Sequence, residues 1–139
     1  MAIKLRVLHY PDNKKLSALC NEISSSYENS KYDKIPPAYP CENEKLLVCF
    51  IKSGKELTAE LKNFVGDLSK ARAQNVFFIF GCAPAVGKAI EDLAIGAGTK
   101  LAGESKYVKF PALPFLDFGA DVKKEIKDAV AAVYQSVQG

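Results

Sequence analysis

A short stretch near the start of the chain, RVLHYPDNKK, gathers polar side chains that can bind an anion or move a proton. His9 is the only histidine, and because histidine titrates near neutral pH a catalytic role is conceivable. Lys14 and Lys15 can attract an anion to the N-terminus of a helix that begins there. We favour a simpler interpretation: a partly buried histidine that bonds a neighbouring loop, beside lysines on a solvated helix face.

A second group of candidate residues surrounds Cys82 in the stretch GCAPAVGK. A helix N-terminus lowers the pKa of a thiol, and Cys82 and Lys88 are spaced like the cysteine and arginine of a C-x5-R phosphate-binding loop. The arginine is absent here, and Pro84 lacks an N–H donor. A thiol or phosphate enzyme is therefore disfavoured against a small apolar thiol at a strand end, and no catalytic residue is assigned.

Composition narrows the class of protein. The four cysteines, which include Cys82, have no C-x-x-C spacing, so we expect free thiols in a reducing cytosol, a cytoplasmic protein and no metal site. The net charge of +3 is modest and the lysines are scattered, which argues against nucleic acid. We expect neither a signal peptide nor membrane association, since MAIKLRVLHY is too short and charged and no apolar run reaches the length of a membrane span.

Hydrophobic spacing predicts alternating strands and helices. The apolar runs KLLVCFI and NVFFIF are typical of strands that are covered on both faces, and apolar residues at helical spacing follow each of them. The predicted strands cover residues 3–8, 31–35, 45–51, 75–80 and 100–110, the last one broken near Gly103. The predicted helices cover residues 13–23, 57–68, 86–97 and 122–137.

Helix ends and element order complete the prediction of the fold. Asp12 or Asn13 can cap the first helix, Asp121 is expected to cap the last, and Gly96 and Gly98 are expected to stop the third. The 139 residues suit a single domain, residues 1–139. The alternation of elements predicts the α/β class, as a three-layer α/β/α sandwich around an open parallel sheet of four or five strands. A binding site in such a sheet lies beyond the carboxyl ends of the strands, where the strand order reverses.

Aromatic and apolar residues cluster around the last predicted strand and the loop after it. They can form a stacking wall or a partner surface, although packing of the sheet end under the last helix is the interpretation we favour. The cluster comprises Tyr107, Phe110, Phe115, Leu116 and Phe118.

The length, the element order and several stretches resemble the flavodoxins. The stretches are YDKIPPAYPCENEKLLVCF, the GK pair at Gly54 and Lys55 before a helix, IFGCAP at the end of a strand, and the terminal amphipathic helix. The resemblance implies a flavodoxin-like sheet with strand order 2-1-3-4-5, flavin mononucleotide (FMN) between the first and third strands, and electron transfer to a redox partner protein. The positions that match the family's cofactor loops are His9, Tyr10, Asp12, Asn13, Lys14, Lys52, Ser53, Gly54, Gly81, Cys82 and Ala83.

The first of these loops departs from the family's T/S-x-T-G-x-T pattern. It is about two residues short, has no glycine and no hydroxyl besides Tyr10, and carries a carboxylate at Asp12, where a phosphate needs converging donors. Pro11 has no N–H, and IKSGKE after the third strand has no aromatic residue to stack on a flavin ring. We therefore expect FMN binding to be weak or absent.

Two functions stay open on this reading. One is a flavodoxin-like, FMN-linked electron-transfer domain, a flavoprotein with weakened or lost flavin binding, in which the cofactor carries the chemistry. The other is a cofactor-free binding or assembly module with the same fold. A flavin or another small anion and a redox partner protein are the expected ligands and partners, and the fold alone does not decide between the two functions.

Overall fold

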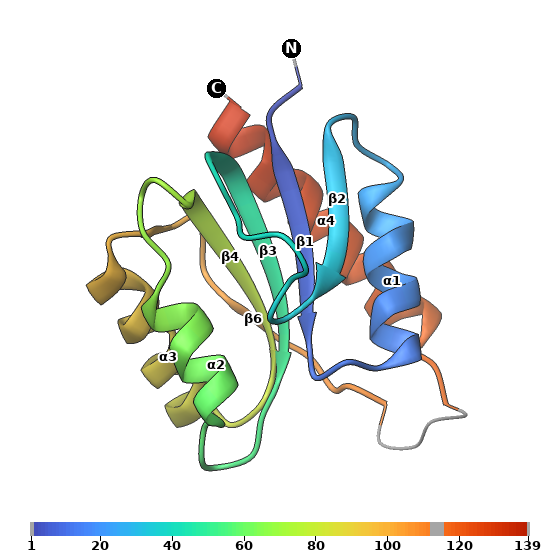
Figure 1. The fold of residues 1–139 in the computed structure, drawn as a ribbon. Coiled ribbons are helices and arrows are strands. Elements are labelled where there is room, and N and C mark those ends of the chain that lie inside the picture. The colour runs from blue at the N-terminus through green and yellow to red at the C-terminus, as the bar shows by residue number, and fades with distance from the viewer. Residues whose placement is uncertain (1, 112–115, 139) are drawn as a thin grey trace.

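The chain forms a parallel sheet with helices on both faces, and the computed structural model describes residues 2–111 and 116–138 (Figure 1). The strands are β1 (Leu5–Tyr10), β2 (Ser30–Lys34), β3 (Glu44–Lys52), β4 (Ala73–Gly81), β5 (Lys100–Leu101) and β6 (Lys106–Tyr107). The helices are α1 (Lys14–Ser24), α2 (Ala59–Gly66), α3 (Pro84–Ala97) and α4 (Ala120–Gln138).

The strand order β2-β1-β3-β4-β5 confirms the predicted topology, with β1 and β3 adjacent and parallel. The strand position beyond β4 is shared by two short strands, because β5 pairs with residues 75–76 of β4 and β6 pairs with residues 79–80. The interruption between them falls at residues 102–105, where the sequence predicted a break near Gly103.

Two apolar clusters fill the two sides of the sheet. One packs β1, β3 and β4 against α1 and α4, and the other packs the opposite faces of these strands against α2 and α3 (Figure 1). Val48 and Cys49 show the alternation, since Val48 belongs to the first cluster and Cys49 to the second, and both are fully buried. The central strands therefore need apolar residues at successive positions, which explains their continuous apolar runs.

The first strand is displaced toward the C-terminus relative to the prediction, because it pairs with strands on both sides. Its ladder with β3 continues to Tyr10, which lies opposite Ile51, and its ladder with β2 continues to His9, opposite Lys34. His9, which the sequence places at the end of the first strand, and Tyr10, predicted in the loop that follows, both belong to β1.

The helix ends follow local chemistry, with two corrections. Asn13 is the N-cap of α1, and Gly98 ends α3 with a positive φ of 109°, a conformation that favours glycine. Gly96 lies inside α3 and does not stop it. Asp121 does not cap α4 either but lies in its first turn, where a carboxylate still interacts favourably with the helix dipole.

Candidate functional site

Three loops meet at the edge of the sheet where the parallel strands end. The register sets Tyr10 of β1 beside Ile51 of β3, and Lys52 of β3 beside Gly81 of β4. The loops that follow are residues 11–13, 53–58 and 82–83. The structure thus brings the predicted cofactor positions to one edge, from three different strands.

Asn13 already occupies the donors at the N-terminus of α1. Its side-chain Oδ1 accepts hydrogen bonds from the backbone N–H groups of Lys15, at 2.8 Å, and Leu16, at 3.2 Å. Its backbone oxygen accepts from the N–H of Ser17 at 2.8 Å. The N–H groups of Lys15 and Leu16 are among the donors that a phosphate bound at a helix N-terminus uses, so an anion that takes them has to displace the cap.

Tyr10 carries the only hydroxyl of the first loop region, and it bonds within the protein. Its phenol oxygen lies 2.7 Å from Oγ1 of Thr58, the N-cap of α2, whose Oγ1 also accepts from the N–H of Leu61 at 3.3 Å. The bond ties the end of β1 to the loop after β3 across the point where the strand order reverses. The helix predicted over residues 57–68 includes Thr58, and the sequence analysis missed this contact, although a Thr before an apolar helical pattern is an N-cap signal.

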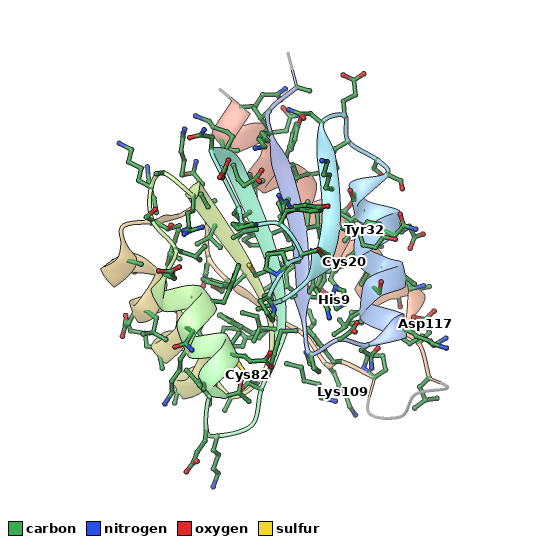
Figure 2. The ribbon with its side chains drawn as sticks, viewed as in Figure 1. His9, Cys20, Tyr32, Cys82, Lys109 and Asp117 are labelled. Atoms are coloured by element: carbon green, nitrogen blue, oxygen red, sulfur yellow. The ribbon has the colours of Figure 1, made fainter. Side chains whose placement is uncertain are left out.

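His9 points into the protein rather than into an open crevice (Figure 2). It is 2% exposed, and neither ring nitrogen has a hydrogen-bond partner among the residues that the structure describes. The carboxylate of Asp12 lies 3.6 Å from Nε2. Burial lowers the pKa of His9, and the nearby Asp12 and Asp33 oppose that shift. Asp12 itself is exposed, so the two members of this pair lie in very different environments.

The residues at the end of β3 are open to solvent. Lys52 and Gly54 are exposed, and a Cβ on Gly54 would meet nothing within 4 Å. The Ser53 hydroxyl donates to the backbone oxygen of Gly54 at 3.0 Å, which folds this loop on itself. Lys14, at the start of α1, is also exposed, as expected for a lysine on a solvated helix face.

The loop after β4 is packed by the aromatic residues near the end of the sheet. A Cβ on Gly81 would lie 2.6 Å from the ring of Phe110, so only a glycine fits there without a shift of that ring. Phe110 also packs on Phe118, with ring centroids 5.4 Å apart, while Tyr107 packs on Phe80. Phe110 and Phe118 are buried, in agreement with the packing interpretation, whereas Tyr107 and Leu116 are exposed. Phe115 lies outside the described residues.

Cys82 lies just after β4 and is partly exposed (Figure 2). Its pKa is raised rather than lowered, because burial outweighs the backbone hydrogen bond from Gly87 that acts in the opposite direction. The raised pKa argues against the thiol enzyme that the sequence analysis already disfavoured. Ala83, the N-cap of α3, makes no side-chain capping bond, and Pro84 follows it.

The residues present do not fit the phosphate group of FMN. Asn13 holds the helix donors, Pro11 has no N–H, and Asp12 places an exposed carboxylate in the same loop. The loop after β3 offers no aromatic ring to stack on a flavin. The loop after β4, whose helix has no side-chain cap, is the part of the edge where backbone N–H groups can still meet the edge of a ring.

Comparison with known proteins defines the class of fold. No protein-family model matches the sequence, and no curated protein matches it either. The structure is similar to the flavodoxin of Streptococcus pneumonia TIGR4, with a TM-score of 0.63 and 10% sequence identity, over 99% of this chain and 98% of that one. The fold is therefore flavodoxin-like, a three-layer α/β arrangement with a parallel sheet.

The described residues form neither a metal-ligand cluster nor a membrane-spanning helix. Among residues 2–111 and 116–138, no group of three or more His, Cys, Asp or Glu side chains is placed to hold a metal ion. Within the same described part of the chain, no helix is both long enough and apolar enough to cross a membrane.

Proposed function

We propose that this chain is a flavodoxin-fold binding module in which FMN binding is weakened or lost. The observation that carries the proposal is the Asn13 cap, in which the N–H groups of Lys15 and Leu16 donate to the Asn13 side chain and not to a ligand. In a flavodoxin-like electron carrier the cofactor supplies the redox chemistry, so a chain that holds the cofactor poorly acts mainly through what else it binds.

The size of the effect follows from the donors involved. A hydrogen bond to a charged group contributes about 1.5–3 kcal/mol, so the two donors held by Asn13 are worth several kcal/mol to a phosphate. Each ~1.4 kcal/mol changes an affinity tenfold. The Asp12 carboxylate adds repulsion, and the exposed Lys14 offsets only part of it because solvent screens its charge.

One observation supports a second candidate function, an electron-transfer domain with loosely held flavin. The N-terminus of α3 has no side-chain cap, and the neighbouring loop after β3 is exposed, so a flavin ring can approach this part of the edge. Binding by the ring alone does not depend on the phosphate. FMN and riboflavin share the ring, so neither candidate predicts a large preference for FMN, and the two candidates differ in how tightly the protein holds the ring.

The test is a fluorescence-quenching titration of the purified protein with FMN and with riboflavin. We expect dissociation constants that are micromolar or weaker and within about threefold of each other, because the phosphate contributes little. Tight binding with a preference of about a hundredfold or more for FMN would contradict the proposal.

A pair of variants tests the role of the cap directly. Asn13→Gly frees the two N–H groups, and glycine at an N-cap costs helix stability only a few tenths of a kcal/mol. We expect it to strengthen FMN binding and to leave riboflavin unchanged. Asn29→Gly is the matched control, since Asn29 has a positive φ of 55° in the turn before β2, away from the loop. Equal responses of the two variants would show that the cap does not control the site.

A further inference from the structure

The connection from β2 to β3 differs from the other crossovers between parallel strands in the described residues. It is the segment 35–43, here called the strap, and it contains no helix, whereas α1, α2 and α3 fill the other connections. The strap passes in front of β1 on the side of the sheet that carries α2 and α3 (Figure 1). Parallel strands are usually joined through a helix, so this side of the sheet has coil where a helix is the usual cover.

The strap is anchored to the sheet at both ends and in its middle. Ile35 and Cys41 are buried in the apolar cluster under α2. Nη1 of Arg6 donates to the backbone oxygen of Tyr39 at 3.0 Å, and the N–H of Ala38 donates to Asp33 at 2.9 Å. The strap is therefore a defined wall rather than a loose cover.

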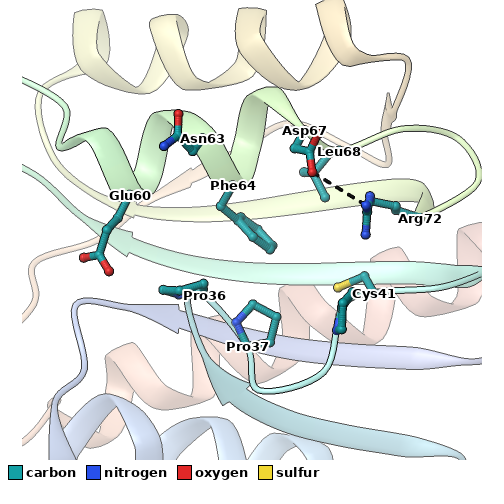
Figure 3. Close-up of a pocket in the computed structure, with 10 residues that line it drawn as sticks. Pro36, Pro37, Cys41, Glu60, Asn63, Phe64, Asp67, Leu68 and Arg72 are labelled. Atoms are coloured by element: carbon teal, nitrogen blue, oxygen red, sulfur yellow. Dashed lines mark ion pairs between the residues drawn. The ribbon is translucent and has the colours of Figure 1, made fainter.

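A groove of about 410 Å³ lies between this wall and α2. Phe64 of α2 points toward Pro36 and Pro37 of the strap, with Leu68 and Cys41 further along (Figure 3). Phe64 is half-buried, while Leu68 and Cys41 are buried. Pockets for small molecules commonly measure about 300–1,000 Å³ and combine apolar walls with a few polar groups, and this groove has that size and composition.

The charges of the groove are unequal at its two ends. The Asp67 carboxylate lies 3.6 Å from Nη2 of Arg72 at one end, and Glu60 lies at the other end, with Phe64 between them (Figure 3). Among the described residues, Glu60 has no ion pair and no side-chain hydrogen bond. With two carboxylates and one guanidinium in its lining, the groove carries a net negative charge, and the unpaired charge is that of Glu60.

We propose that this groove binds a small organic cation with a flat apolar body. The ring of such a ligand packs between Phe64 and the strap prolines, and its ammonium group lies at Glu60. A cation near an aromatic face gains a further attraction from the ring. An anion is disfavoured because the single guanidinium of the groove already faces Asp67.

Glu60 alone does not require a ligand, since a carboxylate in the first turn of a helix also stabilises that helix. The stability of α2 does not explain the cavity beside Glu60 or the half-buried Phe64 that lines it. Its lining shares no residue with the predicted flavin loops. The proposal that flavin binding is weakened or lost and the proposal that this groove binds a cation can therefore be tested independently.

The experiment is a titration followed by two-dimensional amide NMR of the whole chain. Phenethylammonium and phenylpropanoate are the probes, since both carry a phenyl ring on a short chain and they bear opposite charges. We expect saturable shifts at Asn63, Phe64 and Leu68 with the cation, and binding about fivefold weaker or more with the anion. Equal affinities for the two probes, shifts confined to other parts of the molecule, or no saturable shifts would overturn the proposal.

Variants separate the charge from the apolar wall. Glu60→Gln is expected to weaken cation binding about fivefold, whereas Glu56→Gln, which removes the same charge from an exposed residue outside the groove, is expected to change it less than twofold. Phe64→Leu keeps an apolar side chain and is expected to weaken both probes. The amide spectrum of each variant reports whether it is folded. Equal effects of the two Glu variants would assign the selectivity to net charge and overturn the role of Glu60.

Discussion

The edge at the end of β1 and the groove beside α2 treat their polar groups in opposite ways. At the edge, Asn13 caps α1 and Tyr10 bonds Thr58, so the polar groups that could bind a ligand form hydrogen bonds within the protein. In the groove, Glu60 has no ion pair or side-chain hydrogen bond among the described residues, and it lies at one end of an apolar wall that includes the half-buried Phe64. The two regions are joined through α2, since Thr58 begins this helix and Glu60 lies in its first turn.

The difference shows why topology and binding capacity have to be judged separately. The strand order puts the reversal point at β1 and β3, where open α/β sheets commonly bind ligands. A ligand there has to break existing hydrogen bonds, and each broken bond subtracts from its affinity. A ligand in the groove meets an apolar wall and the Glu60 carboxylate, so it has fewer existing hydrogen bonds to break when it binds.

The largest expected effect comes from breaking the support of the strap. Arg6 is buried, donates to Tyr39 of the strap, and lies 3.3 Å from Oε1 of Glu44, which is fully buried. Arg6→Met leaves this carboxylate without its nearest buried cation, and we expect a loss of about 3 kcal/mol in the free energy of unfolding. Urea unfolding followed by circular dichroism measures the change.

Lys4→Met is the control for that prediction. Lys4 lies 3.8 Å from the same carboxylate, but its side chain is 45% exposed, so the pair is screened by solvent. We expect a loss below about 1 kcal/mol. If the two variants lose the same stability, the buried ion pair does not support the strap in the way the structure indicates.

An intermediate effect is expected at the cap of α1. Asn13→Ala removes the acceptor of the Lys15 and Leu16 N–H groups and should lower the free energy of unfolding by about 1 kcal/mol. Asn13→Asp retains an acceptor at the same place and is expected to stay near the wild type or above it. Thermal and urea unfolding of both variants provide the measurement, and an unchanged Asn13→Ala would mean that the cap bonds contribute little.

The smallest effect is expected from pH, and it concerns His9. Burial holds the pKa of His9 below its usual value of 6.5, so the folded state binds fewer protons than the unfolded state. The stability from this group is present above the unfolded pKa and is lost as pH falls through the folded pKa. The free energy of unfolding should therefore decrease as the pH is lowered from about 7 toward 5.

The single histidine makes this pH effect easy to assign. His9→Gln should flatten the slope in that pH interval, because the carboxylates titrate mainly below it. Asp12 and Asp33 oppose the shift, so a stability that instead rises on acidification would show that their attraction exceeds the cost of burying the charged ring.

Most of the fold was accessible from the sequence because its signals are local. The apolar runs around Val48 and Phe78 match β3 and β4, the broken last strand matches β5 and β6, and the proposed cap at Asn13 is confirmed. The errors lie at element ends. β1 extends to Tyr10 because it is paired on both sides, and Asp121 is the second residue of α4 rather than its N-cap.

The candidate site was predicted less well than the fold. The sequence indicated correctly which loops come together, because parallel strands end at one edge. It did not show that Tyr10 bonds Thr58 or that burial raises the pKa of Cys82. The first depends on the relative placement of a strand end and a helix cap 48 residues apart, and the second on how much of the thiol the surrounding chain covers.

By itself, the sequence determined the parallel sheet and its helices, because hydrophobic periodicity is a property of the chain. The lack of glycines and hydroxyls in the first loop gave the expectation that this loop is a weak phosphate site. Only the tertiary structure decided that Arg6 supports the strap and Glu44, and that Phe64 faces Pro36 and Pro37 across a groove. These contacts join residues 27 to 38 positions apart in the chain. Hydrogen bonds and ion pairs need atoms within a few ångströms, and only packing against the sheet sets such distances between remote segments.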